Sequence, residues 1–153
     1  MKRFVWRLQR VLDIKEKEEQ TKRTELLELI KKVTQKRGEL LTQQRILETI
    51  ISDIASKDPQ GRLSEQEFFL KYAATTNELM KKLKNKIAGL ESQQREKVVE
   101  LLRVRRFRES LEKLRAEAKM RYMKSVEKLE QKELDESATI GFARKTMQGS
   151  KIR

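Results

Sequence analysis

The chain has 153 residues, of which 40% are charged and 5% aromatic, with one Pro and five Gly. The absence of Cys and His excludes disulfides, thiolate chemistry and the commonest general base and metal ligand. The formal net charge of +13 predicts an acidic partner, such as a nucleic acid, an anionic membrane surface or an acidic protein cavity. Few helix breakers and many Glu, Lys, Leu, Gln and Arg residues favour long helices over a layered globular domain.

The first ten residues are basic, but no uninterrupted apolar run follows them, so they do not form a signal peptide. No stretch of the sequence approaches the roughly 20 apolar residues of a membrane-spanning helix. We therefore expect a cytoplasmic protein that is soluble or peripherally associated with a membrane.

The first helix is predicted over about residues 3–57. Phe4, Leu8 and Val11 open an apolar seam, and the charged segment 15–23 interrupts it. The seam then resumes one residue out of heptad register, which a local change in supercoil can absorb. Its predicted positions are Leu26, Ile30, Val33, Arg37, Leu40, Gln44, Leu47, Ile51 and Ile54.

A turn is predicted over residues 58–63. Pro59 disfavours helix at Asp58, and Gly61 permits a turn. The second helix should begin at Ser64, because Ser64 and Glu67 have the spacing of a capping box.

The second helix is predicted over about residues 64–140, and residues 141–153 are expected to form a flexible tail. Its apolar positions keep a repeat of three and a half residues over roughly eight heptads, which is typical of a helix packed along a partner helix. At 1.5 Å per residue this stretch would be about 90 Å long, so the partner must also be a long helix. The seam comprises Phe69, Ala73, Thr76, Met80, Leu83, Ile87, Leu90, Gln94, Lys97, Leu101, Val104, Arg108, Leu111, Arg115, Ala118, Tyr122, Ser125 and Leu129.

The predicted fold is all-α, with two long helices forming an antiparallel coiled-coil hairpin in a single elongated domain over residues 1–153. A connection of about six residues makes the two helices antiparallel neighbours. Pairing Ile54 with Phe69 then brings Phe4 near Ala118, and some 20 residues of the second helix overhang the first. A single helix of that size is only marginally stable, so the overhang is expected to dock onto another molecule.

No catalytic arrangement is apparent, since the glycines are isolated and the carboxylates lie on helix faces beside Lys and Arg. We therefore expect neither enzymatic activity nor a cofactor or metal site. The densest basic patch is Arg103, Arg105, Arg106 and Arg108, with Phe107 as its only aromatic residue. A solvated basic face explains it best, while contact with an acidic protein surface and binding to nucleic acid remain alternatives.

The amino-terminal segment is apolar on two faces, because Phe4, Leu8 and Val11 share one stripe while Val5 and Leu12 share another. A helix of that kind is normally buried on two sides. An ordinary sticky terminus is the alternative interpretation.

The two ends of the chain resemble a known family. The amino-terminal end has Phe4, then Arg7-Leu8-Gln9 and Val11-Leu12, followed by Lys15 and Glu18-Glu19. The other end has Glu130-Gln131-Lys132, then Leu134-Asp135-Glu136 and Ala138. Together these residues are similar to the flagellar export protein FliJ family. The resemblance covers the full length in size and architecture, and its discriminating residues lie at the two ends.

The resemblance implies an antiparallel two-helix coiled coil similar to the central stalk of rotary ATPases, acting in the flagellar type III export apparatus. Such a protein would bind the hexameric export ATPase, couple it to the transmembrane export gate, interact with export chaperones, and associate peripherally with the cytoplasmic face of the inner membrane. The candidate ATPase-binding residues, here called the terminal surface, are Phe4, Trp6, Arg7, Leu8, Gln9, Val11, Leu12, Gln131, Leu134, Asp135, Glu136 and Ala138. The candidate gate-facing residues, here called the turn surface, are Gln44, Leu47, Ile51, Phe68, Phe69 and Tyr72.

Three other functions are compatible with the residues. The chain could be the equivalent stalk of a virulence type III secretion system, which gene context would distinguish. It could be a basic coiled coil that binds RNA or DNA, although we expect no nucleic acid. It could also be a self-associating scaffold that uses the overhang.

Overall fold

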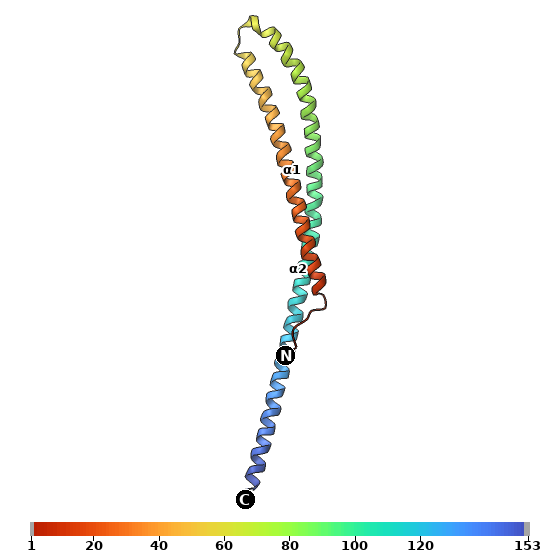
Figure 1. Cartoon of the computed structure of the whole chain (residues 1–153), viewed down its shortest axis with the longest axis vertical. Coiled ribbons are helices and arrows are strands. Elements are labelled where there is room, and N and C mark those ends of the chain that lie inside the picture. The colour runs from red at the N-terminus through yellow and green to blue at the C-terminus, as the bar shows by residue number, and fades with distance from the viewer. Residues whose placement is uncertain (1, 152–153) are drawn as a thin grey trace. The chain divides into compact units, whose positions relative to one another are not determined.

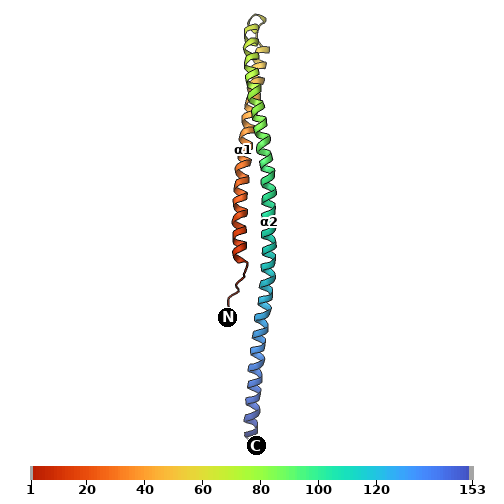
Figure 2. The same cartoon turned by 90° about the vertical axis from the view of Figure 1, so that its right-hand side faces the viewer.

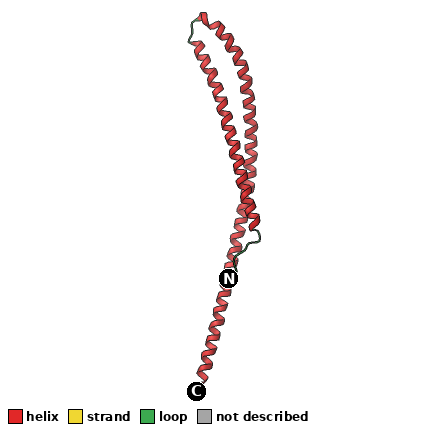
Figure 3. Cartoon of the chain, in the orientation of Figure 1, coloured by secondary structure: helices red, strands yellow, loops and turns green. Residues whose placement is uncertain are grey.

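The computed structural model of the chain describes the backbone of residues 2–151 and the side chains of residues 2–149. It contains two helices, α1 over Gln9–Ala55 and α2 over Pro59–Lys151, of 47 and 93 residues. The described residues include no β-strand, as Figure 3 shows. The predicted all-α fold with two long helices is confirmed.

The chain divides into two compact units, which we describe separately. The hairpin unit comprises residues 17–105, and the terminal unit comprises residues 1–16 together with 106–153. In the hairpin unit α1 and α2 run side by side in opposite directions, as Figures 1 and 2 show. Ion pairs between Lys22 and Glu100 and between Arg37 and Glu91 connect the two helices of this unit.

The α2 seam of the hairpin unit follows the predicted heptad. Thr76, Ile87 and Val104 are buried, and the other predicted seam positions between residues 69 and 104 are half-buried. Steps of three and four residues keep one stripe of a helix facing its partner, because they average close to the helical repeat. This part of the predicted seam is confirmed.

The α1 seam differs from the prediction at three positions. The predicted seam residues Ile30, Arg37 and Ile51 are exposed, and the residue before each of them is half-buried instead. Those preceding residues are Leu29, Lys36 and Ile50. Apolar neighbours such as Leu29 and Ile30 make both registers acceptable to the sequence, and packing against α2 selects one of them.

The charged segment 15–23 does not interrupt the α1 seam. In the hairpin unit Glu19 is buried and Lys22 is half-buried, and they precede Leu26 at steps of three and four residues. The hydrocarbon part of a lysine side chain can pack in a seam while its charged group reaches a partner. The seam therefore continues through charged residues that the sequence analysis had placed outside it.

The turn between the helices is shorter than predicted. Helix α2 begins at Pro59 rather than Ser64, so the predicted start was wrong by five residues. Pro is tolerated at the first helical position because its missing N–H would have no acceptor there, and Asp58 is a favoured residue just before it. The Gly61 N–H donates to the Asp58 carbonyl over 3.1 Å, which places Gly61 inside the first helical turn.

One side chain of α2, Arg62, donates hydrogen bonds to backbone carbonyls at the carboxyl end of α1. Arg62 donates through Nε to the carbonyl of Lys57 and through Nη2 to the carbonyl of Ala55, each over 2.7 Å. The last carbonyls of a helix have no N–H donor within the helix, so they need a donor from elsewhere. A cation also interacts favourably with that end of the helix dipole. Arg62 therefore stabilises the reversal of the chain.

In the terminal unit α1 begins at Gln9, later than the predicted start near residue 3. Residues 2–6 are not helical, and the Gln9 N–H donates to the Trp6 carbonyl where the helix starts. A non-helical chain advances up to about 3.3 Å per residue, against 1.5 Å in a helix. Phe4 therefore packs on Tyr122, with ring centroids 5.4 Å apart, rather than near Ala118 as predicted.

The overhang is also part of the terminal unit. Every side chain of residues 127–149 is exposed, which confirms that α2 extends beyond its partner. The flexible tail predicted for residues 141–153 is wrong as far as Lys151, because α2 continues to that residue. Ile152 and Arg153 lie outside the described residues. Within the described part of the chain, neither helix has an apolar stretch long enough to cross a membrane.

Candidate functional site

The amino-terminal half of the terminal surface is held on α2 by one arginine. Arg115 donates through Nε to Oε1 of Gln9 over 2.8 Å, and its guanidinium lies 5.8 Å from the centroid of the Phe4 ring. Tyr122 packs on Phe4 and donates through its hydroxyl to the Lys2 carbonyl. Arg115 and Tyr122 thus position a non-helical segment, and we call the four side chains Phe4, Gln9, Arg115 and Tyr122 the terminal clamp.

The heptad pattern predicts Arg115 and Tyr122 as seam residues and does not predict that they hold the first residues. The sequence does indicate that Arg115 has a polar partner, because an arginine at a seam position needs a hydrogen-bond acceptor. What the sequence lacked was the start of α1, which decides whether Gln9 or Leu8 lies opposite Arg115.

The members of the terminal surface have different environments. Leu12 is buried, with 3% of its surface exposed, and Phe4, Trp6, Leu8 and Gln9 are half-buried. Only Arg7 and Val11 of this half are classed as exposed. Much of the predicted amino-terminal surface therefore packs on the chain itself.

The other half of the terminal surface is fully accessible. Leu134 is 70% exposed, and its four companions in the set are also exposed. Those companions are Gln131, Asp135, Glu136 and Ala138. A hollow of about 420 Å³, lined by Lys2, Tyr122, Val126, Leu129 and Glu133 among others, lies where the amino-terminal segment ends and the overhang begins.

The turn surface is likewise divided between seam and solvent. Gln44, Leu47, Phe69 and Tyr72 are half-buried, whereas Ile51 and Phe68 are exposed. The Phe68 and Tyr72 rings are stacked on α2, with centroids 6.3 Å apart. These two rings therefore present an aromatic surface beside the turn.

The protein-family model described as "Flagellar FliJ protein" matches residues 3–147 of the chain. The chain belongs to the FliJ family. No curated protein and no solved structure gave a significant match. The family match covers nearly the whole chain and makes this protein a component of flagellar protein export, which favours the flagellar interpretation over a virulence secretion stalk.

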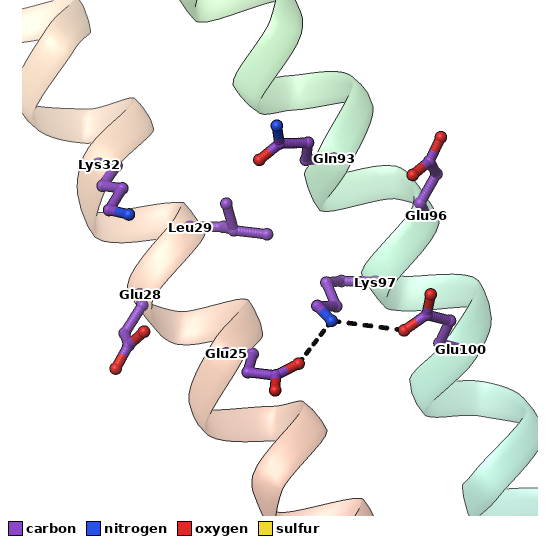
Figure 4. A pocket seen from close by; sticks show the side chains of 8 residues that line it. All are labelled: Glu25, Glu28, Leu29, Lys32, Gln93, Glu96, Lys97 and Glu100. Atoms are coloured by element: carbon purple, nitrogen blue, oxygen red, sulfur yellow. Dashed lines mark hydrogen bonds and ion pairs between the residues drawn. The ribbon is translucent and has the colours of Figure 1, made fainter.

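This FliJ family chain also has a charged cluster in the hairpin unit, formed by Lys22, Glu25, Lys97 and Glu100, of which Figure 4 shows the last three. Lys97 Nζ lies 2.5 Å from Glu25 Oε2 and 3.5 Å from Glu100 Oε2. Lys22 Nζ lies 2.9 Å from the same oxygen of Glu100. The cluster lines part of a hollow of about 370 Å³ between α1 and α2.

The cluster shifts the pKa values of three side chains. The hydrogen bond from Lys97 lowers the pKa of Glu25, and that from Lys22 lowers the pKa of Glu100. The hydrogen bond to Glu25 raises the pKa of Lys97. A hydrogen bond or opposite charge beside an ionised group favours its charged form.

The chemistry of this cluster is structural. Its two lysines and two carboxylates pair with one another across α1 and α2. Among residues 2–149 no group of three potential ligands is placed to hold a metal ion. We therefore regard the terminal and turn surfaces as the candidate functional sites of this FliJ family member.

Proposed function

We propose that this protein is a coiled-coil stalk that binds the hexameric flagellar export ATPase through its terminal surface. The stalk couples the ATPase to the transmembrane export gate through its turn surface and also engages export chaperones. ATP is bound and hydrolysed by the ATPase, and the stalk itself is not an enzyme. The protein is cytoplasmic and associates with the inner membrane peripherally, through the export apparatus.

One observation supports the ATPase contact above the others. Residues 127–149 of α2 have no covering segment within the terminal unit, although Leu129, Leu134 and Phe142 are large apolar side chains in that stretch. Isolated helices of this length are only marginally stable in water, so a partner that covers them gains the burial of apolar surface. A rigid helix with an uncovered apolar end fits a socket in another protein.

The experiment compares two leucine-to-aspartate variants with equal exposure. Leu134→Asp changes a side chain that is 70% exposed on the terminal surface, and Leu63→Asp changes one that is 71% exposed near the turn. Neither substitution removes a buried contact, so both proteins should keep their helix content. Association with the export ATPase of the same organism is measured together with its steady-state ATPase rate and with images of its rings.

We expect the wild-type protein to stimulate ATP hydrolysis and to fill the central pores of the rings. Leu134→Asp should weaken association about tenfold or more, because burying a carboxylate without a partner is costly. Leu63→Asp should leave both measurements unchanged. Equal behaviour of Leu134→Asp and the wild-type protein would contradict the proposed contact.

Binding to nucleic acid remains the alternative from another functional class. A labelled duplex titrated at two salt concentrations tests it, because several phosphate contacts make affinity fall steeply with salt. Tight binding at physiological salt would favour that function. Weak binding, together with ATPase association, would favour the stalk.

A further inference from the structure

One stretch of the overhang is acidic although the whole chain carries a net charge of +13. Residues 127–138 contain five carboxylates and two lysines, and all of their side chains are exposed. Leu129 and Leu134 lie in the same stretch, with Glu130 and Glu133 between them in the chain. We call residues 127–138 the acidic segment. It offers apolar and anionic groups to a partner at the same time.

The hairpin unit has a surface of the opposite charge. On α1, Leu27 is 60% exposed and is followed at helical spacing by Ile30 and Thr34. These residues line a hollow that also includes one cation, Lys31, and one carboxylate, Glu28. On α2, Val98 and Leu102 are exposed apolar residues, and Arg95 precedes them at the same spacing.

The register of the hairpin brings these two rows together. The ion pair between Arg37 and Glu91 fixes which positions of α1 and α2 meet on this side. One heptad along an antiparallel pair leads to the next facing positions on the same side. Seven residues before Arg37 on α1 is Ile30, and seven residues after Glu91 on α2 is Val98. The register therefore places the two rows on the same side of the hairpin unit, and together we call them the basic face. It consists of Leu27, Ile30, Lys31, Thr34, Arg95, Val98 and Leu102.

The cations of the basic face are available to a partner. Lys31 and Arg95 are exposed, and neither has an ion-pair partner among residues 2–149. Glu91, which lies on the same side, is already paired with Arg37. Glu28 also lines the hollow on α1, so Lys31 and Arg95 leave a small excess of positive charge, which favours an anionic occupant.

We propose that the basic face binds the acidic segment of a second copy of this chain. Leu129 and Leu134 lie about 140° apart around α2, so they occupy the two edges of the contact, where they pack against Leu27, Ile30, Val98 and Leu102 of the other copy. Glu130 and Glu133 face Lys31 and Arg95. Elsewhere the two strongly cationic copies repel each other, so attraction is confined to this pair of surfaces, and the contact is weak and dependent on salt.

The proposed self-association does not depend on the proposed stalk function, but it would compete with binding to the ATPase. Leu134 belongs both to the acidic segment and to the terminal surface, so a second copy and the ATPase compete for the same side chain. Self-association therefore covers the uncovered end of α2 until the ATPase displaces the second copy.

Sedimentation of the full chain over a broad range of concentration tests the proposal. We expect a dimer that forms as concentration rises at about 0.1 M salt and dissociates at about 1 M salt, where the screening length falls from about 10 Å to about 3 Å. A chain that remains monomeric at all concentrations at the lower salt would overturn the proposal.

Two charge-reversal variants give the sharper test. The face variant carries Lys31→Glu and Arg95→Glu, and the segment variant carries Glu130→Lys and Glu133→Lys. Each alone should weaken self-association at least about tenfold, because like charges then face each other. An equimolar mixture should associate again, since each variant then supplies a surface that complements the other.

The mixture separates this proposal from a general effect of charge. If both variants still dimerise as the wild-type protein does, the proposal is wrong. If neither associates and their mixture also fails to associate, the two surfaces do not contact each other, and the proposal is wrong again. All four substituted side chains are exposed, so retained helix content is expected, and circular dichroism checks it. None of the four belongs to the terminal surface, so the face variant should still associate with the ATPase, and at least as tightly as the wild-type protein because a second copy no longer competes for Leu134.

Discussion

Arg115 and Gln9 are joined by a hydrogen bond of 2.8 Å, from the guanidinium Nε to the side-chain Oε1. The two residues are far apart in sequence, and Gln9 is the first residue of α1. The same guanidinium lies over the Phe4 ring. One arginine of α2 thus holds both the start of α1 and the non-helical segment that precedes it.

Arg115→Met should loosen residues 2–8 without unfolding the hairpin unit. It removes a charge-assisted hydrogen bond and a cation–π contact, which together contribute about 1–2 kcal/mol. Tryptic cleavage after Arg3 and Arg7 should then become about five- to thirtyfold faster, because the open population rises by that factor. Arg121→Met is the matched control, since Arg121 is exposed and has no partner among the described residues. Equal cleavage of both variants would show that Arg115 does not hold the segment.

The charged cluster of the hairpin unit makes stability depend on pH in a defined direction. The folded pKa values of Glu25 and Glu100 are lowered, so their stabilisation is complete above their ordinary value of 4.5 and is lost as pH falls through the lower folded values. The folded pKa of Lys97 is raised, so its stabilisation is complete below 10.5 and is lost only at higher pH. The unfolding free energy should therefore fall in acid.

Lys97→Met should reduce this acid dependence, because it removes the main cause of the lowered Glu25 pKa. Glu100 should keep part of its shift through Lys22. Denaturant unfolding at several values below pH 5 measures the slope of the unfolding free energy against pH. Lys84→Met, at an exposed position of α2 without an ion-pair partner in the described chain, is the control. An unchanged slope in Lys97→Met would exclude the cluster as its source.

Two helical glycines should be replaceable with a gain in stability. Gly38 and Gly89 lie within helices without positive φ, and an added Cβ at either would meet no atom within 4 Å. Gly38→Ala and Gly89→Ala should each raise the unfolding free energy by about 0.5–1 kcal/mol, because Ala loses less backbone freedom on folding. Urea unfolding followed by circular dichroism measures this. A decrease in either variant would show that the glycine has a role beyond its place in the helix.

Phe68→Ala, on the turn surface, should weaken binding to the export gate and leave the stability of the fold almost unchanged. Phe68 is 68% exposed, so its loss should change the unfolding free energy by no more than about 0.5 kcal/mol. Large exposed aromatic side chains often dominate binding energies, and we expect the affinity for the cytoplasmic part of the export gate to fall about tenfold. Leu70→Ala, at a similarly exposed neighbour outside the turn surface, is the control. Equal affinity in the two variants would contradict the role of Phe68.

The sequence by itself determined the helical class, the antiparallel hairpin, the overhang and the α2 seam from Phe69 to Tyr122, whereas the last two predicted seam positions, Ser125 and Leu129, are exposed. The physical reason is local, because an unbroken heptad repeat from Phe69 onward has one apolar stripe and a short connection leaves one neighbour for it. The family resemblance was likewise present in the residues at the two ends, and the family match confirmed it. The terminal and turn surfaces as binding sites remain predictions.

The tertiary structure decided the register of α1 and the residue at which each helix begins, because neighbouring residues suit either choice equally well. Leu29 and Ile30 are both apolar, so only packing against α2 could choose between them. The start of α1 at Gln9 depended on Arg115 and Tyr122 holding a non-helical segment, which no local pattern encodes. Pro59 could break a helix or begin one, and the structure places it at the first helical position, where its missing N–H costs nothing.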